Sequence, residues 1–361
     1  MGKDTRAASA GIAAAGDHHT AVAAAEVLAD GGNAFDAVLA GLFTACIAEP
    51  VLCSLGGGGF LLARTAAGNS TLYDFFCQTP GRRLSADELE FLPVHVDFGT
   101  SRQEFHIGMG AFAVPGMVAG AFAIHQDLCT LPMTRLVQPA IALARQGIAL
   151  APLQSFILEA VAPIYQWSGD CRALYNSPST PEQTLRAGET LALPALADFL
   201  EALAREGADL FYCGEVAQAI AAVNRDGGGA VSLEDLADYQ IARRTPLSQR
   251  FGDADIIGNP APSSGGPLMA FTIGLLQDAP AVGHAEYLQQ LIQAMDLTDQ
   301  ARQASGLNEH CDDARVAALL SETFMAEYRA RMPGRASKIG GTTHISVVDA
   351  MGNAAAMSVS N

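Results

Sequence analysis

The stretch GGTTHISVVDAMGNAAAMSVSN, from Gly340 to Asn361, joins a glycine pair and two threonines to an alternating apolar pattern. Gly352 and Asn353 favour a tight turn, so the residues on either side are predicted to pair as a β-hairpin. Because side chains of a strand alternate between its two faces, the first strand divides into His344, Ser346 and Val348 on one face and Ile345, Val347 and Asp349 on the other. The stretch therefore predicts a half-buried hairpin.

The same stretch carries a candidate nucleophile at the start of the first strand. If the bond between Gly341 and Thr342 is cleaved, Thr342 gains a free α-amine beside its own hydroxyl. The amine can then serve as the general base that activates the hydroxyl. Glycine before the threonine eases the strained backbone that self-cleavage requires. The alternative is that threonine stands here only because it is common in strands.

Composition limits the class of protein. The chain has 361 residues, of which 50% are hydrophobic and 16% are charged, so it can bury a sizeable core. A net charge of −17 without a basic run argues against nucleic acid and against an anionic membrane surface. No stretch has the pattern of a signal peptide or a membrane helix. We expect a cytoplasmic protein, or a periplasmic one if a signal has been removed.

The cysteines and the chemistry of the candidate nucleophile bear on cofactors. Seven cysteines are scattered without a CxxC pair, which indicates reduced thiols rather than a disulfide framework. A threonine and its own amine suffice for acyl chemistry, so we expect no cofactor and no metal site.

The order of predicted elements indicates an α+β fold. One helix is expected from Thr20, as its N-cap, to Gly31, and a second, apolar nearly all round, from Asn33 to just before Pro50. Two apolar runs flank AAGN and predict a hairpin, residues 115–228 are mostly helical, and the closing hairpin follows a last helical stretch. Antiparallel strands covered by helices fit this order, within a single domain spanning residues 1–361.

GGTTHISVVDAMGNAAAMSVSN resembles the processing-site segment of the gamma-glutamyltranspeptidase family, whose members are N-terminal nucleophile hydrolases. Further segments follow in the family's order: GGNAFDAVLAG, EPVLCSLGGGGFLLAR, AVPGMVAG, VQPAIALARQGI, GADLFYCGEVAQAI, SLEDLADYQ and NPAPSSGGPLMA. The resemblance implies an αββα sandwich, incomplete at its C-terminus, with a large-subunit region 1–341 and the start of a small subunit at 342–361. It also implies autocatalytic cleavage before Thr342 and a threonine-bound acyl intermediate.

The resemblance transfers roles to residues of the closing stretch. Thr342 would be the nucleophile and new N-terminus, and Thr343 and His344 complete the motif. Ser360 stands where the family has a threonine that hydrogen-bonds the nucleophile. Asn361 lies close to the position of an asparagine that contacts the α-amino group of the substrate. Thr342, Thr343 and Ser360 are thus the expected catalytic residues.

One departure from the family concerns the substrate pocket. The family binds the glutamyl α-carboxylate with an arginine in a DFRE-like segment, whereas this chain has DFFC, with Phe76 and Cys77 in the last two places. Phenylalanine cannot replace a bidentate guanidinium–carboxylate contact. Arg82 or Arg83 could bring a charge from another direction, the alternative being a solvated turn. His106 is a further candidate for substrate contact, the alternative being a structural histidine.

A second departure concerns length, because the family's small subunit continues far beyond its threonine. We therefore expect the remainder of the small subunit as a partner and expect this chain alone to be incomplete and inactive; a homodimer is left open. Three functions stay in view: a gamma-glutamyl hydrolase or acyltransferase acting on small-molecule amides, an amidase for a less polar acyl group suited to Phe76, and a non-catalytic homologue.

Overall fold

The computed structural model describes residues 10–99, 101–277, 284–332 and 343–360. The chain divides into two compact units. The first comprises Met1–Asn69, Tyr73–Ala242 and Thr342–Asn361, and the second comprises Ser70–Leu72 and Arg243–Gly341. Each unit has a hydrophobic core of its own. The single domain expected from the sequence stays a prediction.

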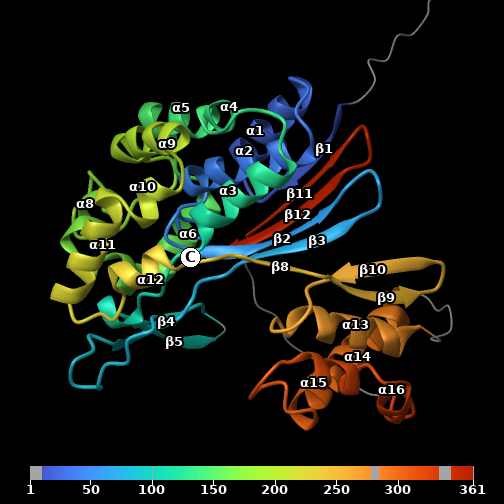
Figure 1. The fold of residues 1–361 in the computed structure, drawn as a ribbon. Helices are drawn as coiled ribbons and strands as arrows, with labels where there is room; N and C mark the ends of the chain where they lie inside the picture. Colours follow the sequence, from blue (N-terminus) through green and yellow to red (C-terminus); the bar gives the residue numbers. More distant parts are fainter. Residues whose placement is uncertain (1–9, 100, 278–283, 333–342, 361) are drawn as a thin grey trace, which may run out of the picture. The chain divides into compact units, whose positions relative to one another are not determined.

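A six-stranded sheet organises the first unit (Figure 1). Its order in space is β1 (Gly11–Ala15), β11 (Thr343–Asp349), β12 (Ala354–Ser360), β2 (Gly58–Arg64), β3 (Ser70–Phe75) and β8 (Ala242–Arg244). The pairs from β1 to β2 are antiparallel. The closing hairpin, β11 and β12, thus lies between strands from the first fifth of the chain. The predicted hairpin is confirmed, with Gly352 at φ +88° in its turn.

The alternation along β11 and β12 sets the register of the sheet. Ile345, Val347 and Met357 are buried on one face, whereas Val348 is exposed on the other. The buried face packs against α2, Ala34–Ala48. A slip of one residue would move every apolar side chain to the wrong face, so burial against α2 specifies the register.

Helix α2 forms as its sequence predicts. The Asn33 side chain accepts hydrogen bonds from the backbone N–H of Phe35 at 2.8 Å and of Asp36 at 2.9 Å. The Asp36 carboxylate accepts in return from the Asn33 N–H at 2.9 Å, which completes a capping box. Every residue of α2 is buried, as expected for a helix that is apolar on all sides.

The expected start of the first helix is wrong. Helix α1 spans His18–Ala29 and its N-cap is Asp17, whose carboxylate accepts from the His19 N–H at 2.7 Å. Thr20 is buried inside the helix, and its hydroxyl donates to the Glu49 carboxylate at 3.1 Å. A tertiary partner thus takes the hydroxyl that a cap would have used, and the neighbouring carboxylate supplies the cap.

Asp349 and Asn353 connect three distant segments. The Asp349 carboxylate accepts from the Ala34 N–H at the start of α2 and from both the backbone and the side chain of Asn353. The Asn353 side-chain oxygen accepts from the Ala66 N–H, in the turn between β2 and β3, at 2.7 Å. The turn of the closing hairpin is thereby tied to both the helix and the neighbouring strand pair.

The predicted helical middle, residues 115–228, is confirmed, and one short helix lies just before it and one just after it. Its helices are η1 (Met109–Ala111), α3 (Met117–Leu128), α4 (Met133–Leu136), α5 (Gln138–Gln146), α6 (Pro152–Ala160), α7 (Ala162–Tyr165), α8 (Gly169–Tyr175), α9 (Pro194–Glu206), α10 (Asp209–Tyr212), α11 (Glu215–Asp226) and α12 (Leu233–Ala237). Two small strand pairs accompany them: β4 (Leu92–Asp97) with β5 (Arg102–Ile107), and β6 (Ile148–Ala149) with β7 (Thr190–Leu191).

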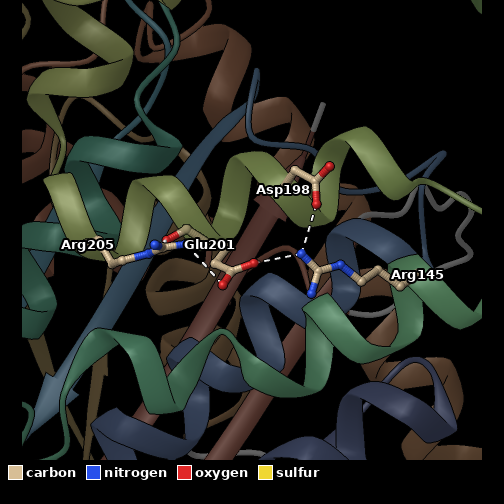
Figure 2. A network of polar contacts seen from close by, with 4 residues as sticks. All are labelled: Arg145, Asp198, Glu201 and Arg205. Carbon is tan, nitrogen blue, oxygen red and sulfur yellow. Dashed lines mark hydrogen bonds and ion pairs between the residues drawn. The ribbon is translucent and has the colours of Figure 1, made fainter.

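Figure 2 shows an ion-pair network between α5 and α9. The Arg145 guanidinium donates to Asp198 at 2.8 Å and to Glu201 at 2.6 Å, and Arg205 pairs with Glu201 at 3.0 Å. These hydrogen bonds raise the pKa of Arg145. All four side chains are well exposed, so the network orients two helices whose packing comes from their apolar faces.

The second unit packs helices against a hairpin. Its elements are β9 (Leu247–Phe251), β10 (Ala254–Gly258), α13 (Gly265–Leu276), α14 (His284–Ala304), α15 (Asp313–Leu319) and α16 (Glu322–Arg329). Phe271, Leu275 and Met325 lie at the centre of its core. Across the described ranges of both units, no helix combines the length and the apolar character needed to cross a membrane.

Candidate active site

Three strand ends lie side by side at one end of the six-stranded sheet. Strand β11 begins at Thr343, β12 ends at Ser360 and β2 begins at Gly58. The register places Thr343 opposite Val359 and Ser360 opposite Gly58. At this end of the sheet the two ends of the closing hairpin adjoin the glycine-rich start of β2. This end is the candidate active site.

The structure describes only some of the residues that are expected at this end of the sheet. Thr342 directly precedes β11 in the sequence, and both Thr342 and Asn361 lie outside the described residues. For Thr343 the structure describes the strand pairing. Ser360 is half-buried at the last position of β12. The roles of all four residues stay predictions.

His344 joins the two strands of the closing hairpin on the open face of the sheet. Its Nδ1 lies 2.8 Å from the Ser358 hydroxyl oxygen, and its Nε2 lies 3.0 Å from that of Ser346. Burial lowers the pKa of His344, which favours the neutral imidazole. A neutral imidazole donates from one nitrogen and accepts at the other, so the ring can orient both serine hydroxyls at once. The sequence identified His344 as part of the motif but not this bridge.

Close backbone contact explains the glycines at the start of β2. A Cβ on Gly58 would lie 2.7 Å from the Cys77 nitrogen, and one on Gly59 would lie 2.5 Å from the Ser358 carbonyl oxygen. Neither position accepts a side chain without movement of the backbone. These two glycines belong to a strand, while the turn before it is formed by Leu55 and Gly56. The close approach of neighbouring backbone, rather than a turn, therefore accounts for the last two of the four glycines.

An aromatic pair that includes Phe76 borders the open face of the sheet. The Phe76 ring stacks on Phe60, with centroids 5.5 Å apart and planes at 15°. Phe60 stands opposite Ser358 in the register of β2 and β12, and so beside the His344 bridge. The Phe76 carbonyl accepts from the Tyr239 hydroxyl at 2.8 Å. Phe76 remains 53% exposed, so its ring offers an apolar surface to a ligand.

Cys77, directly after Phe76, is half-buried, and burial raises the pKa of its thiol. Cys77 is therefore poorly suited to act as a nucleophile, because the thiolate is the reactive form. We therefore interpret Cys77 as an inert thiol next to the site.

The two other predicted substrate contacts are Arg83 and His106, and the contacts described for them do not include the residues of the His344 bridge. Arg83 is exposed in the segment after β3. His106 belongs to the β4–β5 pair, where its ring stacks on Phe91 at a centroid distance of 4.0 Å and lies 3.7 Å from the Glu104 carboxylate. These contacts account for the orientation of His106 within its own hairpin. Substrate binding by Arg83 and His106 stays a prediction.

Known proteins resemble the chain over most of its length. A family model described as Gamma-glutamyltranspeptidase matches residues 20–361. The Acylase ACY 1 proenzyme of Pseudomonas sp. (strain V22) is 30% identical over 92% of this chain and 62% of that protein. The Glutathione hydrolase proenzyme of Escherichia coli (strain K12) is 32% identical over 75% of this chain and 46% of that protein. The chain thus spans about three-fifths or less of the length of these relatives.

Solved structures resemble the fold. The gamma-glutamyltranspeptidase of Helicobacter pylori aligns with a TM-score of 0.77 at 24% identity, covering 91% of this chain and 93% of that one. The gamma-glutamyltranspeptidase of Pseudomonas nitroreducens complexed with L-DON aligns with a TM-score of 0.73 at 26% identity, covering 90% and 95%. The predicted fold class, α+β of the N-terminal nucleophile hydrolase type, is confirmed.

Proposed function

The chain belongs to the gamma-glutamyltranspeptidase family, and from that premise we propose that it hydrolyses or transfers the acyl group of gamma-glutamyl or related amides with Thr342 as nucleophile. The observation that carries the proposal is the place of Thr342 in the chain. It directly precedes β11 in the sequence, and β11 begins at the end of the sheet where β12 ends and β2 begins. An N-terminal residue there would be held by a strand that is paired on both sides.

The proposed reaction begins after cleavage between Gly341 and Thr342. The Thr342 hydroxyl oxygen attacks the amide carbon of the substrate, and the free amine of Thr342 accepts the hydroxyl proton. That proton passes to the leaving amine, so the acyl group remains on Thr342 as an ester. Water or an acceptor amine then attacks the ester and restores the hydroxyl. Ser360, at the end of the neighbouring strand, is proposed to hydrogen-bond the nucleophile.

The tetrahedral intermediate also requires hydrogen-bond donors for its oxyanion. The proposal takes these donors from the part of the relatives that this chain does not match, since the chain covers 62% of the V22 acylase. In this proposal a further small-subunit segment is the partner that completes the site.

A specific observation favours an acyl group less polar than glutamyl. The stacked rings of Phe60 and Phe76 present an aromatic surface at the position of the family's carboxylate-binding arginine. An aromatic or aliphatic acyl group gains contact area there, whereas a carboxylate gains no ion pair. The V22 relative is named an acylase, a name that does not specify a glutamyl group.

The first experiment measures the intact mass of the denatured full-length gene product. We expect two fragments separated between Gly341 and Thr342. Thr342→Ala should remain one chain and lose turnover by about 10³-fold or more, while Thr342→Ser should retain processing. A wild-type product that stays uncleaved in the presence of the small-subunit segment would favour the non-catalytic homologue.

A second experiment separates the two substrate classes. The processed protein is given a gamma-glutamyl anilide and a benzoyl or fatty-acyl anilide, as wild type and as Phe76→Ala. Loss of the ring should lower kcat/KM for the apolar substrate by about tenfold, which corresponds to about 1.4 kcal/mol, and should change the gamma-glutamyl substrate little. The opposite selectivity would exclude Phe76 as an acyl contact.

A further inference from the structure

Two buried thiols face each other at the end of α2. Cys46 lies in the last turn of the helix and Cys53 in the turn that follows, with their sulfur atoms 3.5 Å apart. The segment between them is held by the Glu49 carbonyl oxygen, which accepts from the N–H groups of Leu52 at 2.9 Å and Cys53 at 3.0 Å. The two sulfur atoms are therefore kept together by regular backbone hydrogen bonds rather than by chance orientation of exposed side chains.

Both cysteines line a cavity of about 350 Å³ in the first unit. Apart from Ser54 its other walls are apolar or aromatic: Pro50, Leu55, Leu174, Tyr175, Leu193, Pro194, Ala195 and Leu196. Cys46 and Cys53 are only 3% and 0% exposed, so a reagent that reacts with them has to be accommodated in the cavity beside them. Its lining carries no charged side chain and thus favours small uncharged molecules.

We propose that Cys46 and Cys53 form a dithiol site that takes small, uncharged, thiol-reactive ligands, namely apolar disulfides and aryl compounds of trivalent arsenic. Two thiols at 3.5 Å can be joined with a small movement of their side chains. The five remaining cysteines, of which Cys213 is the exposed one, provide isolated thiols for comparison.

The reaction with a disulfide RSSR balances as two thiol–disulfide exchanges. One of the two thiols loses its proton and attacks one sulfur of RSSR, which forms a mixed disulfide and releases one RSH. The other thiol then loses its proton and attacks the protein sulfur of that mixed disulfide, which closes the Cys46–Cys53 disulfide and releases the second RSH. With an aryl arsenic(III) oxide, two As–S bonds form and one water is released, without a change in oxidation state.

The surroundings of Cys53 disfavour its thiolate. The hydrogen bond to Cys46, burial, and the nearby charges of Cys46 and Glu49 raise the pKa of Cys53 well above its usual value. The proposal itself rests on the short distance between the two sulfur atoms and on the cavity beside them, and it holds whichever thiol reacts first.

Dithiodipyridine, an uncharged aromatic disulfide that releases a coloured thione, tests the proposal on the native full chain. Trypsin then yields the peptide 7–64, which contains Cys46 and Cys53 and no other cysteine. We expect this peptide to lose two hydrogen atoms and to carry no pyridylthio group, with two thiones released for the pair. The Cys213 peptide should instead carry one pyridylthio group for one thione.

Two variants and a second probe keep the test decisive. In Cys53→Ser and in Cys46→Ser, the peptide 7–64 should retain the pyridylthio group of a mixed disulfide and should not lose two hydrogen atoms, because the second thiol is missing. Phenylarsine oxide should protect both cysteines of the native wild type from alkylation and should protect neither single variant. The proposal is overturned if Cys46 and Cys53 remain free thiols while Cys213 reacts, or if each retains its own pyridylthio group.

Discussion

The two faces of the six-stranded sheet come from the same strands but differ in burial and in the chemistry of their side chains. On the face against α2, Ile345 and Met357 are fully buried. On the open face, Val348 is 48% exposed and Ile12 is 74% exposed. The open face also carries the His344 bridge and the stacked ring of Phe60.

This difference assigns separate tasks to the two faces. The helix-covered face needs only apolar side chains of suitable volume, and it contributes to the free energy of unfolding. The open face holds polar and aromatic groups next to the candidate active site, where their arrangement decides chemistry rather than stability. Alternation along a strand allows both tasks to be met by neighbouring residues.

The largest expected effect comes from a methionine on the helix-covered face. Met357→Ala should lower the free energy of unfolding by about 2–5 kcal/mol, because it removes a fully buried side chain and leaves a cavity. Met351→Ala, in the hairpin turn and 69% exposed, should change it by less than about 0.5 kcal/mol. Urea unfolding measures both. Equal losses would contradict the assignment of stability to the buried face.

Adjacent valines compare the two faces with the same residue type. Val347→Ala, on the buried face, should cost about 2 kcal/mol, since it removes the equivalent of two buried methylene groups. Val348→Ala, on the open face, should cost less than about 1 kcal/mol. If the two costs are the same in urea unfolding, the open face is covered by packing in the folded protein.

The link between the hairpin turn and α2 should show in the acid range. Burial raises the pKa of Asp349, but hydrogen bonds from Asn353, Ala34 and Met351 outweigh it and hold the pKa below its usual value. Asp349 therefore contributes stability above the unfolded pKa of about 3.9, and the contribution is lost as pH falls through the lower folded value.

Asp349→Asn should accordingly lower the free energy of unfolding by about 1–3 kcal/mol near neutral pH. The side-chain NH₂ group of asparagine would face N–H donors that now bind the carboxylate. The difference from wild type should shrink as pH falls below about 4. Asp253→Asn, an exposed position, serves as the control in the same unfolding measurements. A difference that is constant from pH 7 to pH 3 would contradict a role for the carboxylate charge.

The smallest expected effect concerns His344 on the open face. Burial lowers its pKa, so the unfolded chain binds the proton first as pH falls through about 6.5. Stability should therefore decrease slightly between about pH 6.5 and the lower folded pKa. His344→Gln should remove this decrease, whereas exposed His310→Gln should leave it in place. A decrease that persists in His344→Gln would assign it to another group.

Local patterns identified much of the fold. Helix α2 was predicted because Asn33 is a good start, Asp36 suits the first turn and the residues after them are apolar. The start of α1 was not, since Asp17 and Thr20 are both good caps and only the Glu49 contact decides between them. The choice depends on a partner far along the chain.

The candidate site divides in the same way. The motif GTTH indicated the proposed nucleophile and predicted the strand that follows, and the departure at Phe76 was visible in the sequence. The stacking of Phe76 on Phe60, the Tyr239 contact and the bridge by His344 were not, because each joins residues from different elements.

The sequence by itself determined the elements, the family and the identity of the residues at the candidate site, since capping, alternation and turn chemistry act between near neighbours. Tertiary structure decided which elements became neighbours: the closing hairpin between β1 and β2, Asp349 on the start of α2, and Cys46 beside Cys53 at a cavity. The physical reason is that burial and hydrogen bonding in three dimensions select one partner among many that local patterns permit.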